Sequence, residues 1–183
     1  MDDPTRAAYV TRMRILAVCG SLQAKSSNIS LLQAAARSAP PDVEVVLFDG
    51  LRDLPYFDPD LEAAGAPPSV TAWRTALATS DGMLIASPEY GHSLPGVLKN
   101  AIDWAISSGE LEYKVVAITC AAPVPARGRM GLQALRQTLT ATSSCLVGGE
   151  PIVKGPEFER DAAALLAALI AQIRAPRQTF RVS

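Results

Sequence analysis

The most informative stretch of the chain is residues 87–104, S-P-E-Y-G-H-S-L-P-G-V-L-K-N-A-I-D-W. They follow the apolar run at residues 83–86, which has the length of a buried strand, and they change abruptly into polar, aromatic, glycine and proline residues. From Pro95 onward, apolar residues recur at the spacing of one helical face, at Val97, Leu98, Ala101, Ile102 and Ala105. The segment therefore predicts a strand, an exposed polar loop and a helix. In open parallel α/β sheets, such loops border the ligand-binding crevice.

The alternation of strand and helix extends along the chain. Strands are predicted at residues 14–19, 43–48, 83–86, 115–118 and 146–153, the last divided by a Gly-Gly turn, and helices follow each of them. Residues 49–62 are predicted to be irregular and residues 119–131 to form a long loop. The pattern predicts one doubly wound parallel α/β domain at residues 13–175, with a flexible arm at 1–12 and a tail at 176–183.

The composition of the chain bears on its partners and its location. The chain has 183 residues, of which 49% are hydrophobic, and 17 basic residues nearly balance 18 acidic ones. This balance gives no electrostatic reason to expect nucleic acid or an anionic membrane as partner. The chain starts without a secretory pattern and its longest apolar run, residues 162–171, is too short to span a bilayer, so a cytoplasmic protein is expected.

Three cysteines and one histidine argue against both a disulfide framework and a Cys/His zinc site. The cysteines are expected to be small buried residues at strand ends, and no metal is expected.

A second polar loop, G-S-L-Q-A-K-S-S-N at residues 20–28, joins the first strand to the first helix. Free backbone N–H groups and the positive end of the helix dipole suit it to a phosphate. A Ser/Asn cluster before a helix is more often only a cap, so the loop by itself favours capping. It contains neither a Walker A sequence nor G-x-G-x-x-G.

Three segments, at residues 20–28, 54–62 and 88–104, together resemble the NAD(P)H-dependent FMN reductase family, the flavodoxin-like group that includes chromate, azo-dye and quinone reductases. The similarity extends from about Arg14 to Ile173, and the order of the three motifs favours the phosphate interpretation of the first loop.

The resemblance implies a flavodoxin-like sheet of strand order 2-1-3-4-5, with FMN across its carboxyl edge and NADPH or NADH as hydride donor. No catalytic acid, base or nucleophile is implied. The implied cofactor-binding residues are Ser21, Gln23, Ser26, Ser27 and Asn28 around the phosphate, Pro88, Glu89, Tyr90, Gly91, His92 and Ser93 beside the isoalloxazine, and Thr119, Cys120 and Ala121 on its other side.

The chain departs from the family pattern at two motifs. Gln23 stands where the family usually has Arg, which predicts weaker retention of FMN unless Lys25, Arg127 or Arg129 compensates. Gly91 stands where Asn is common, and a segment rich in proline and arginine replaces the glycine-rich loop after the fourth strand.

Within the loop at 88–93, His92 is either a proton donor or a surface group, and Glu89 is expected to hold the loop through backbone hydrogen bonds rather than act as a base. Tyr90 is expected to be a ring neighbour or a subunit contact. Lys99 and Asp103, four residues apart, are expected to form a surface ion pair of small energetic value.

The resemblance implies a reductase that passes electrons to a small molecule, namely a quinone, an azo compound, a metal oxyanion or a free flavin. A flavodoxin-type electron carrier is the first alternative, although such carriers are markedly acidic, and a flavin-free binding or regulatory protein is the second. A homodimer or homotetramer is also implied. Its candidate contacts, Tyr56, Phe57 and Trp104, could equally be core residues.

Overall fold

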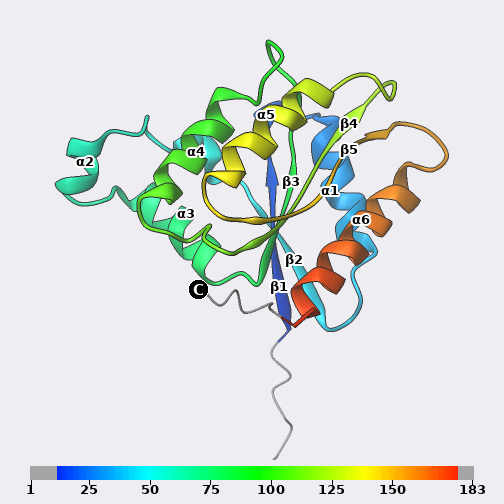
Figure 1. The fold of residues 1–183 in the computed structure, drawn as a ribbon, viewed down its shortest axis with the longest axis horizontal. Coiled ribbons are helices and arrows are strands. Elements are labelled where there is room, and N and C mark those ends of the chain that lie inside the picture. The colour runs from blue at the N-terminus through cyan, green and yellow to red at the C-terminus, as the bar shows by residue number, and fades with distance from the viewer. Residues whose placement is uncertain (1–11, 177–183) are drawn as a thin grey trace, which may run out of the picture.

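The computed structural model describes residues 12–176, so the predicted arm and tail lie outside the described residues except for Arg12 and Pro176. Its centre is one parallel sheet of five strands in the order β2-β1-β3-β4-β5 (Figure 1). The strands are β1 (Met13–Cys19), β2 (Val43–Phe48), β3 (Gly82–Ala86), β4 (Val115–Ala122) and β5 (Cys145–Val153). The predicted flavodoxin-like strand order is confirmed.

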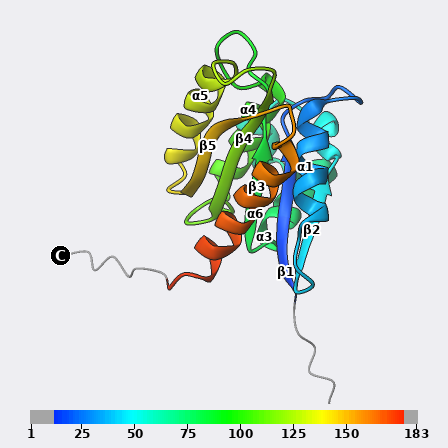
Figure 2. The same ribbon diagram turned by 90° about the vertical axis from the view of Figure 1, so that its right-hand side faces the viewer.

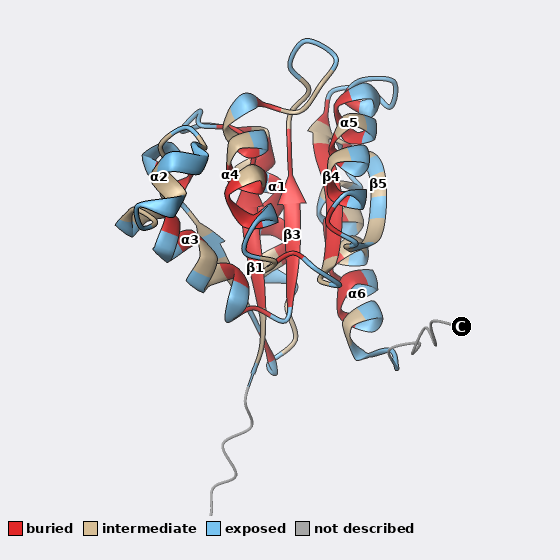
Figure 3. Cartoon of the chain, turned by 60° about the vertical axis from the view of Figure 1, so that its left-hand side comes forward, coloured by how far each residue is buried: buried red, intermediate tan, exposed pale blue. Residues whose placement is uncertain are grey.

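Helices cover both faces of the sheet (Figure 2). On one face, α1 (Ser27–Arg37) and α6 (Phe158–Arg174) pack over a core that includes Ile15 and Leu84. On the other face, α3 (Pro68–Ala78), α4 (Gly96–Ile106) and α5 (Arg129–Thr140) enclose Trp73 and Trp104. The three inner strands β1, β3 and β4 are the most deeply buried (Figure 3), because both of their faces are covered.

Two segments differ from the sequence-based prediction. Residues 49–62, predicted to be irregular, contain the 3-10 helix η1 (Gly50–Asp53) and the short helix α2 (Pro59–Ala63). The first residue of α2 is a proline, and the Asp58 carboxylate caps the helix. Residues 119–122, predicted to begin a loop, extend β4. Thr119 pairs with Ala86 of β3. Residues 120–122 stay in the sheet because β5 continues past its two glycines and pairs with these three residues after a shift in register.

The prediction that the cysteines are buried is confirmed for two of the three. Cys19 and Cys120 are buried, and burial raises the pKa of both thiols, that of Cys120 to about 11. Cys145 is exposed at the start of β5, which contradicts the prediction for that residue. Within residues 12–176, no helix has the length and apolar character needed to cross a membrane.

Residues 54–62, which lead from η1 into α2, are fastened to α4 near the edge of the sheet. The Pro55 carbonyl accepts from Asn100 Nδ2 at 2.9 Å and from Trp104 Nε1 at 2.8 Å, and the Phe57 amide donates to Asn100 Oδ1 at 2.8 Å. Phe57 also packs edge-on against the Trp104 ring, with centroids 5.1 Å apart. The backbone around Tyr56 is therefore held rigidly, while the Tyr56 side chain points outward with the residue 90% exposed.

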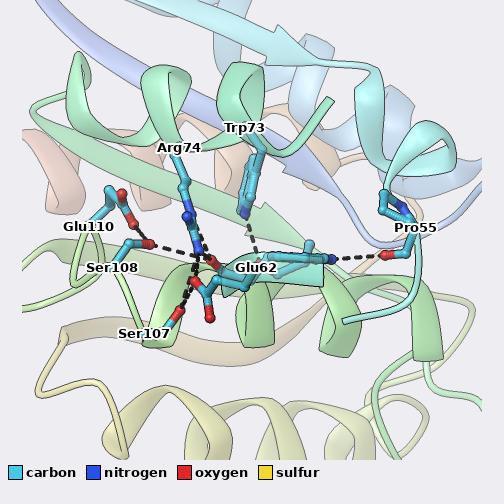
Figure 4. A network of polar contacts seen from close by, with 9 residues as sticks. Pro55, Glu62, Trp73, Arg74, Ser107, Ser108 and Glu110 are labelled. Carbon is cyan, nitrogen blue, oxygen red and sulfur yellow. Dashed lines mark hydrogen bonds and ion pairs between the residues drawn. The ribbon is translucent and has the colours of Figure 1, made fainter. Parts of the chain in front are cut away.

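Arg74 of α3 fastens the far end of the same segment (Figure 4). Its guanidinium pairs with Glu62, donates to the Trp104 carbonyl at 2.8 Å and lies 5.8 Å from the centre of the Trp104 ring. Hydrogen bonds from Ser107 and Arg74 hold the pKa of Glu62 below its usual value. This arginine joins α2, α3 and α4.

Arg74→Met should lower the free energy of unfolding by about 1–3 kcal/mol, because it leaves a partly buried carboxylate and a carbonyl without their donor. Arg37→Met is the matched control, because the Arg37–Glu159 pair is 61% and 75% exposed in its two side chains. It should change stability by less than about 0.5 kcal/mol. Urea unfolding measures both, and equal effects would contradict the role given to Arg74.

Candidate functional site

Two polar loops leave the carboxyl edge of the sheet side by side, because β1 and β3 are neighbours. The Gly20 amide donates to the Ala86 carbonyl at 2.9 Å, and the Ser87 amide donates to the Thr119 carbonyl at 2.9 Å. These bonds continue the ladders beyond the strand ends. The loop after β1 and the loop after β3 therefore start from fixed positions, and the second projects beyond the sheet (Figure 3).

The loop after β1 combines a helix cap with free donors. Ser26 caps α1, since its Oγ accepts from the Asn28 amide at 3.2 Å. Within the part of the chain that the structure describes, the amides of Leu22, Ala24, Lys25 and Ser27 have no acceptor. Free amides at a helix N-terminus are donors that suit a phosphate, so the residues present fit the phosphate of FMN.

Asn28 ties this loop to β4. Its Oδ1 accepts from the Ala121 amide at 2.9 Å, and the residue is 4% exposed. The Asn28 oxygen is thus engaged with the protein, which leaves only its Nδ2 to donate to a ligand. Ala121 lies at intermediate exposure beside it, whereas Thr119 and Cys120 are 1% and 2% exposed.

The side chains of Thr119 and Cys120 contact β5 and α5 respectively. Thr119 Oγ1 donates to the Glu150 carbonyl of β5 at 2.9 Å, and Cys120 packs against Leu132 of α5. The expectation that residues 119–121 form a loop beside the cofactor is wrong in its secondary structure, because Thr119 is paired with Ala86 of β3 and residues 120–121 are paired with β5.

The loop after β3 closes in a tight hairpin. Tyr90 and Ser93 exchange two backbone hydrogen bonds of 3.0 Å, and the two residues between them, Gly91 and His92, have φ values of +56° and +61°. Positive φ at both central positions is the type I′ geometry, which favours Asn and Gly. Glycine at position 91 is therefore a conservative departure from the Asn that the family commonly has there.

Glu89 anchors this hairpin to α5. Its Oε2 accepts from the Gly131 amide at 3.0 Å, in the first turn of α5, and its Oε1 lies 3.5 Å from His92 Nδ1. The hydrogen bond from Gly131 is the largest cause that holds the pKa of Glu89 below its usual value. A Cβ at Gly131 would lie 2.9 Å from the Glu89 backbone, so only glycine allows this approach.

Glu89 thus has the structural role predicted for it. His92 is a surface group whose side chain is 73% exposed. Lys99 and Asp103 form the predicted ion pair, with 2.6 Å between Nζ and Oδ1. Among residues 12–176, no group of three or more histidine, cysteine or carboxylate side chains could hold a metal.

Sequence reasoning missed one cation at this edge. Arg52 of η1 donates from Nη2 to the Leu22 carbonyl at 2.9 Å, so it contacts the loop after β1. Of the cations expected to compensate for Gln23, Arg129 instead pairs with Glu150 at 3.1 Å. The position of Arg52 shortly after β2 could have indicated that it lies near the loop after β1, since all strands of a parallel sheet end at the same edge.

A larger hollow than the one beside the loop after β1 lies elsewhere. It is an open groove of about 770 Å³ along the outer face of α3, lined mainly by small residues such as Thr71, Ala72 and Thr75. Its polar lining consists of Arg14, which stands at the amino end of β1, and three threonines. We therefore place the candidate site at the carboxyl edge, where the donors gather.

Glu89→Gln should reduce the free energy of unfolding by about 1 kcal/mol at pH 7, because glutamine keeps an acceptor but loses the charge at the helix N-terminus. Since the folded-state pKa of Glu89 is lowered, its stabilisation is present above the ordinary value of about 4.3 and is lost as pH falls through the folded-state pKa. The difference between wild type and variant should therefore shrink in acid.

Denaturant unfolding at pH 7 and at pH 3.5 checks this expectation. Glu44→Gln is the control, since Glu44 is exposed on β2 and makes no ion pair within the described residues. A stability difference for Glu89→Gln that does not change with pH would show that the carboxylate charge contributes nothing.

Comparison with known proteins places this architecture in a family. Residues 13–175 match the family described as NADPH-dependent FMN reductase. The chain is 38% identical over 133 residues to an NAD(P)H-dependent FMN reductase of Pseudomonas aeruginosa, which covers 69% of each chain. It is 35% identical over 94 residues to a quinone reductase of Escherichia coli, covering 51% of this chain and 50% of that protein. The matched region thus spans only about half the length of several relatives.

Solved structures agree on the fold. A flavoenzyme NAD(P)H:(acceptor) oxidoreductase of Paracoccus denitrificans superposes with a TM-score of 0.74 at 24% identity, covering 87% of this chain and 98% of that one. An azoreductase of Bacillus anthracis gives a TM-score of 0.58 at 17% identity, covering 88% and 96%. The chain therefore belongs to the NADPH-dependent FMN reductase family, which confirms the predicted oxidoreductase with FMN as its cofactor and NAD(P)H as its hydride donor.

Proposed function

We propose that the protein holds FMN across the carboxyl edge of the sheet and passes electrons from NAD(P)H to a small quinone-type acceptor. The observation that carries this proposal is the loop after β1, where four amides lack acceptors within the described residues beside the buried hydroxyl of Ser21. A phosphate bound there lies at one end of the cofactor. The neighbouring hairpin after β3 then borders the flavin ring.

Each group of residues has a distinct task in this arrangement. Ser21, Gln23, Ser27 and Asn28 Nδ2 supply donors to the phosphate, while Ser26 serves α1 as its cap. The side chains of Pro88, Tyr90 and Ser93 and the backbone of residues 91–92 border the ring, and Ala121 lies on the opposite side. Bound FMN supplies the hydride chemistry, so the protein needs to orient rings rather than to provide an acid or base.

Exposed apolar side chains near this edge support an aromatic acceptor. Tyr90 is 55% exposed, Val124 is 49% exposed in the loop after β4, and Met130 is 50% exposed in the first turn of α5. Flat apolar rings such as quinones pack well against such side chains. Relatives named quinone reductase support the same class of acceptor over azo compounds, metal oxyanions and free flavins.

The alternative of an electron carrier lacks electrostatic support. A formal net charge of −1 gives no strong field with which to dock on a basic partner protein. The free cysteines of the described residues are consistent with a reducing compartment, and we place the protein in the cytoplasm.

We also propose a homo-oligomer whose interface includes Tyr56. Trp104 is fully buried and Phe57 packs against it, so of the three candidate contacts only Tyr56 presents its ring outward. Because hydrogen bonds to Asn100 and Trp104 hold the backbone on both sides of Tyr56, an interface here would cost little conformational entropy. A second copy is the partner that the family resemblance implies.

Purified protein mixed with FMN should bind it and then oxidise NADPH or NADH in the presence of 1,4-benzoquinone. Ser21→Ala should weaken FMN binding about tenfold, because it removes a buried hydroxyl donor. Ser38→Ala, the same change at the other end of α1, should leave FMN affinity unchanged. Flavin fluorescence and absorbance at 340 nm measure binding and turnover. Bound flavin without turnover would indicate a carrier, and an absence of flavin binding would refute the proposal.

Tyr56→Asp should shift the protein toward a monomer, since a desolvated charge in an apolar contact opposes association. Light scattering coupled to size exclusion measures the mass, with Tyr113→Asp as the control for another exposed tyrosine, 70% exposed. An unchanged mass for Tyr56→Asp would remove Tyr56 from the interface.

A further inference from the structure

A small cavity opens beside the proposed phosphate loop, at the carboxyl end of β2. Its volume is about 200 Å³, and its polar lining consists of Ser21, Gln23, Asp49 and Arg52. Sites that enclose drug-sized ligands measure about 300–1,000 Å³. This cavity therefore suits one polar group of a larger ligand rather than a whole nucleotide.

Arg52 is positioned in the wall of this cavity with most of its donors unused. One Nη2 hydrogen is donated to the Leu22 carbonyl at 2.9 Å, and among the described residues its guanidinium has no ion pair and no other hydrogen bond. A guanidinium carries five N–H donors, so four remain. The bond to Leu22 restrains a cation that can still offer a planar fork to an anion.

The other polar groups of the cavity wall complement this cation. Ser21 is 8% exposed, and its Oγ accepts from the Gln23 amide at 3.2 Å. Within residues 12–176 its hydroxyl hydrogen has no acceptor, so it can donate to a ligand. The Gln23 side chain offers an amide donor without charge. Asp49 is the one acidic group of the lining and opposes an anion.

We propose that Arg52, Ser21 and Gln23 form a subsite for a phosphomonoester, with Arg52 as its cation. This inference rests on the proposed function, in which two phosphomonoesters are available: the 5′-phosphate of FMN and the 2′-phosphate of NADPH. Arg52 then supplies, from the element after β2, the positive charge that Gln23 does not supply from the loop after β1. A dianion beside Ser21 and Gln23 alone would lack a countercharge.

The test compares ligands that differ only in the phosphate. For wild type and Arg52→Gln, dissociation constants for FMN and for riboflavin come from flavin fluorescence, and KM values for NADPH and NADH come from steady-state kinetics. Arg52→Gln should either weaken the binding of FMN on the order of tenfold while the affinity for riboflavin is unchanged, or raise the KM for NADPH by a similar factor while the KM for NADH is unchanged. The first result assigns the subsite to FMN and the second to NADPH.

Variants that remove the negative charge or restore the positive charge test whether charge is the cause. Asp49→Asn should tighten binding of the same ligand a few fold, since it removes the opposing charge. Arg52→Lys should retain part of the affinity, and Gln23→Arg should restore affinity in the Arg52→Gln protein by returning the charge from the loop after β1. Arg37→Gln, on the exposed surface of α1, should change nothing. Thermal unfolding of each variant confirms folding.

Two results would overturn the subsite. One is unchanged affinity for both FMN and NADPH in Arg52→Gln. The other is an equal loss for riboflavin and FMN, which would show that Arg52 only holds the loop through Leu22. Failure of the proposed function is distinguishable, because wild type would then bind no flavin. In that case inorganic phosphate should still raise the melting temperature of wild type but not of Arg52→Gln, and equal responses would reject the subsite.

Discussion

The hydrogen bond from the Gly20 amide to the Ala86 carbonyl, which closes the ladder between β1 and β3, sets the geometry of the whole carboxyl edge. Both strands are buried on both faces, so their ends cannot shift without disturbing two cores at once. The loops that follow them are consequently neighbours at a fixed separation. Everything proposed for the site depends on that adjacency, because a flavin must be held at its phosphate and bordered at its ring by separate segments.

Both loops are also held by contacts with distant parts of the chain. Asn28 reaches from the loop after β1 to the backbone of β4, and Glu89 reaches from the hairpin after β3 to the first turn of α5. In each contact, a polar side chain of the motif binds another part of the protein rather than a ligand. The free amides of residues 22–27 and the outward faces of the hairpin are what remains for ligands. The scaffold is therefore organised before any ligand arrives, which reduces the entropic cost of binding.

Much of this could be predicted from the sequence. Apolar runs of strand length and alternating helical faces define the sheet, and three motifs in order identify the family. The roles of Asn28, Thr119 and Cys120 could not be predicted, because a polar or small residue near a strand end can face either a ligand or a neighbouring strand. The extension of β4 through residue 122 depends on pairing with β5, which is a nonlocal interaction. Arg52 was overlooked for a similar reason, since its contact with Leu22 joins residues 30 positions apart.

The central claim is that the phosphate of FMN binds at the loop between β1 and α1. Titration of ¹⁵N-labelled protein with FMN, followed by two-dimensional ¹H–¹⁵N NMR, tests it most directly because each amide reports its own environment. The largest shifts should fall on the amides of Leu22, Ala24, Lys25 and Ser27, and riboflavin should shift them far less. Shifts that instead concentrate on α3, around the open groove lined by Thr71 and Thr75, would contradict the site described above.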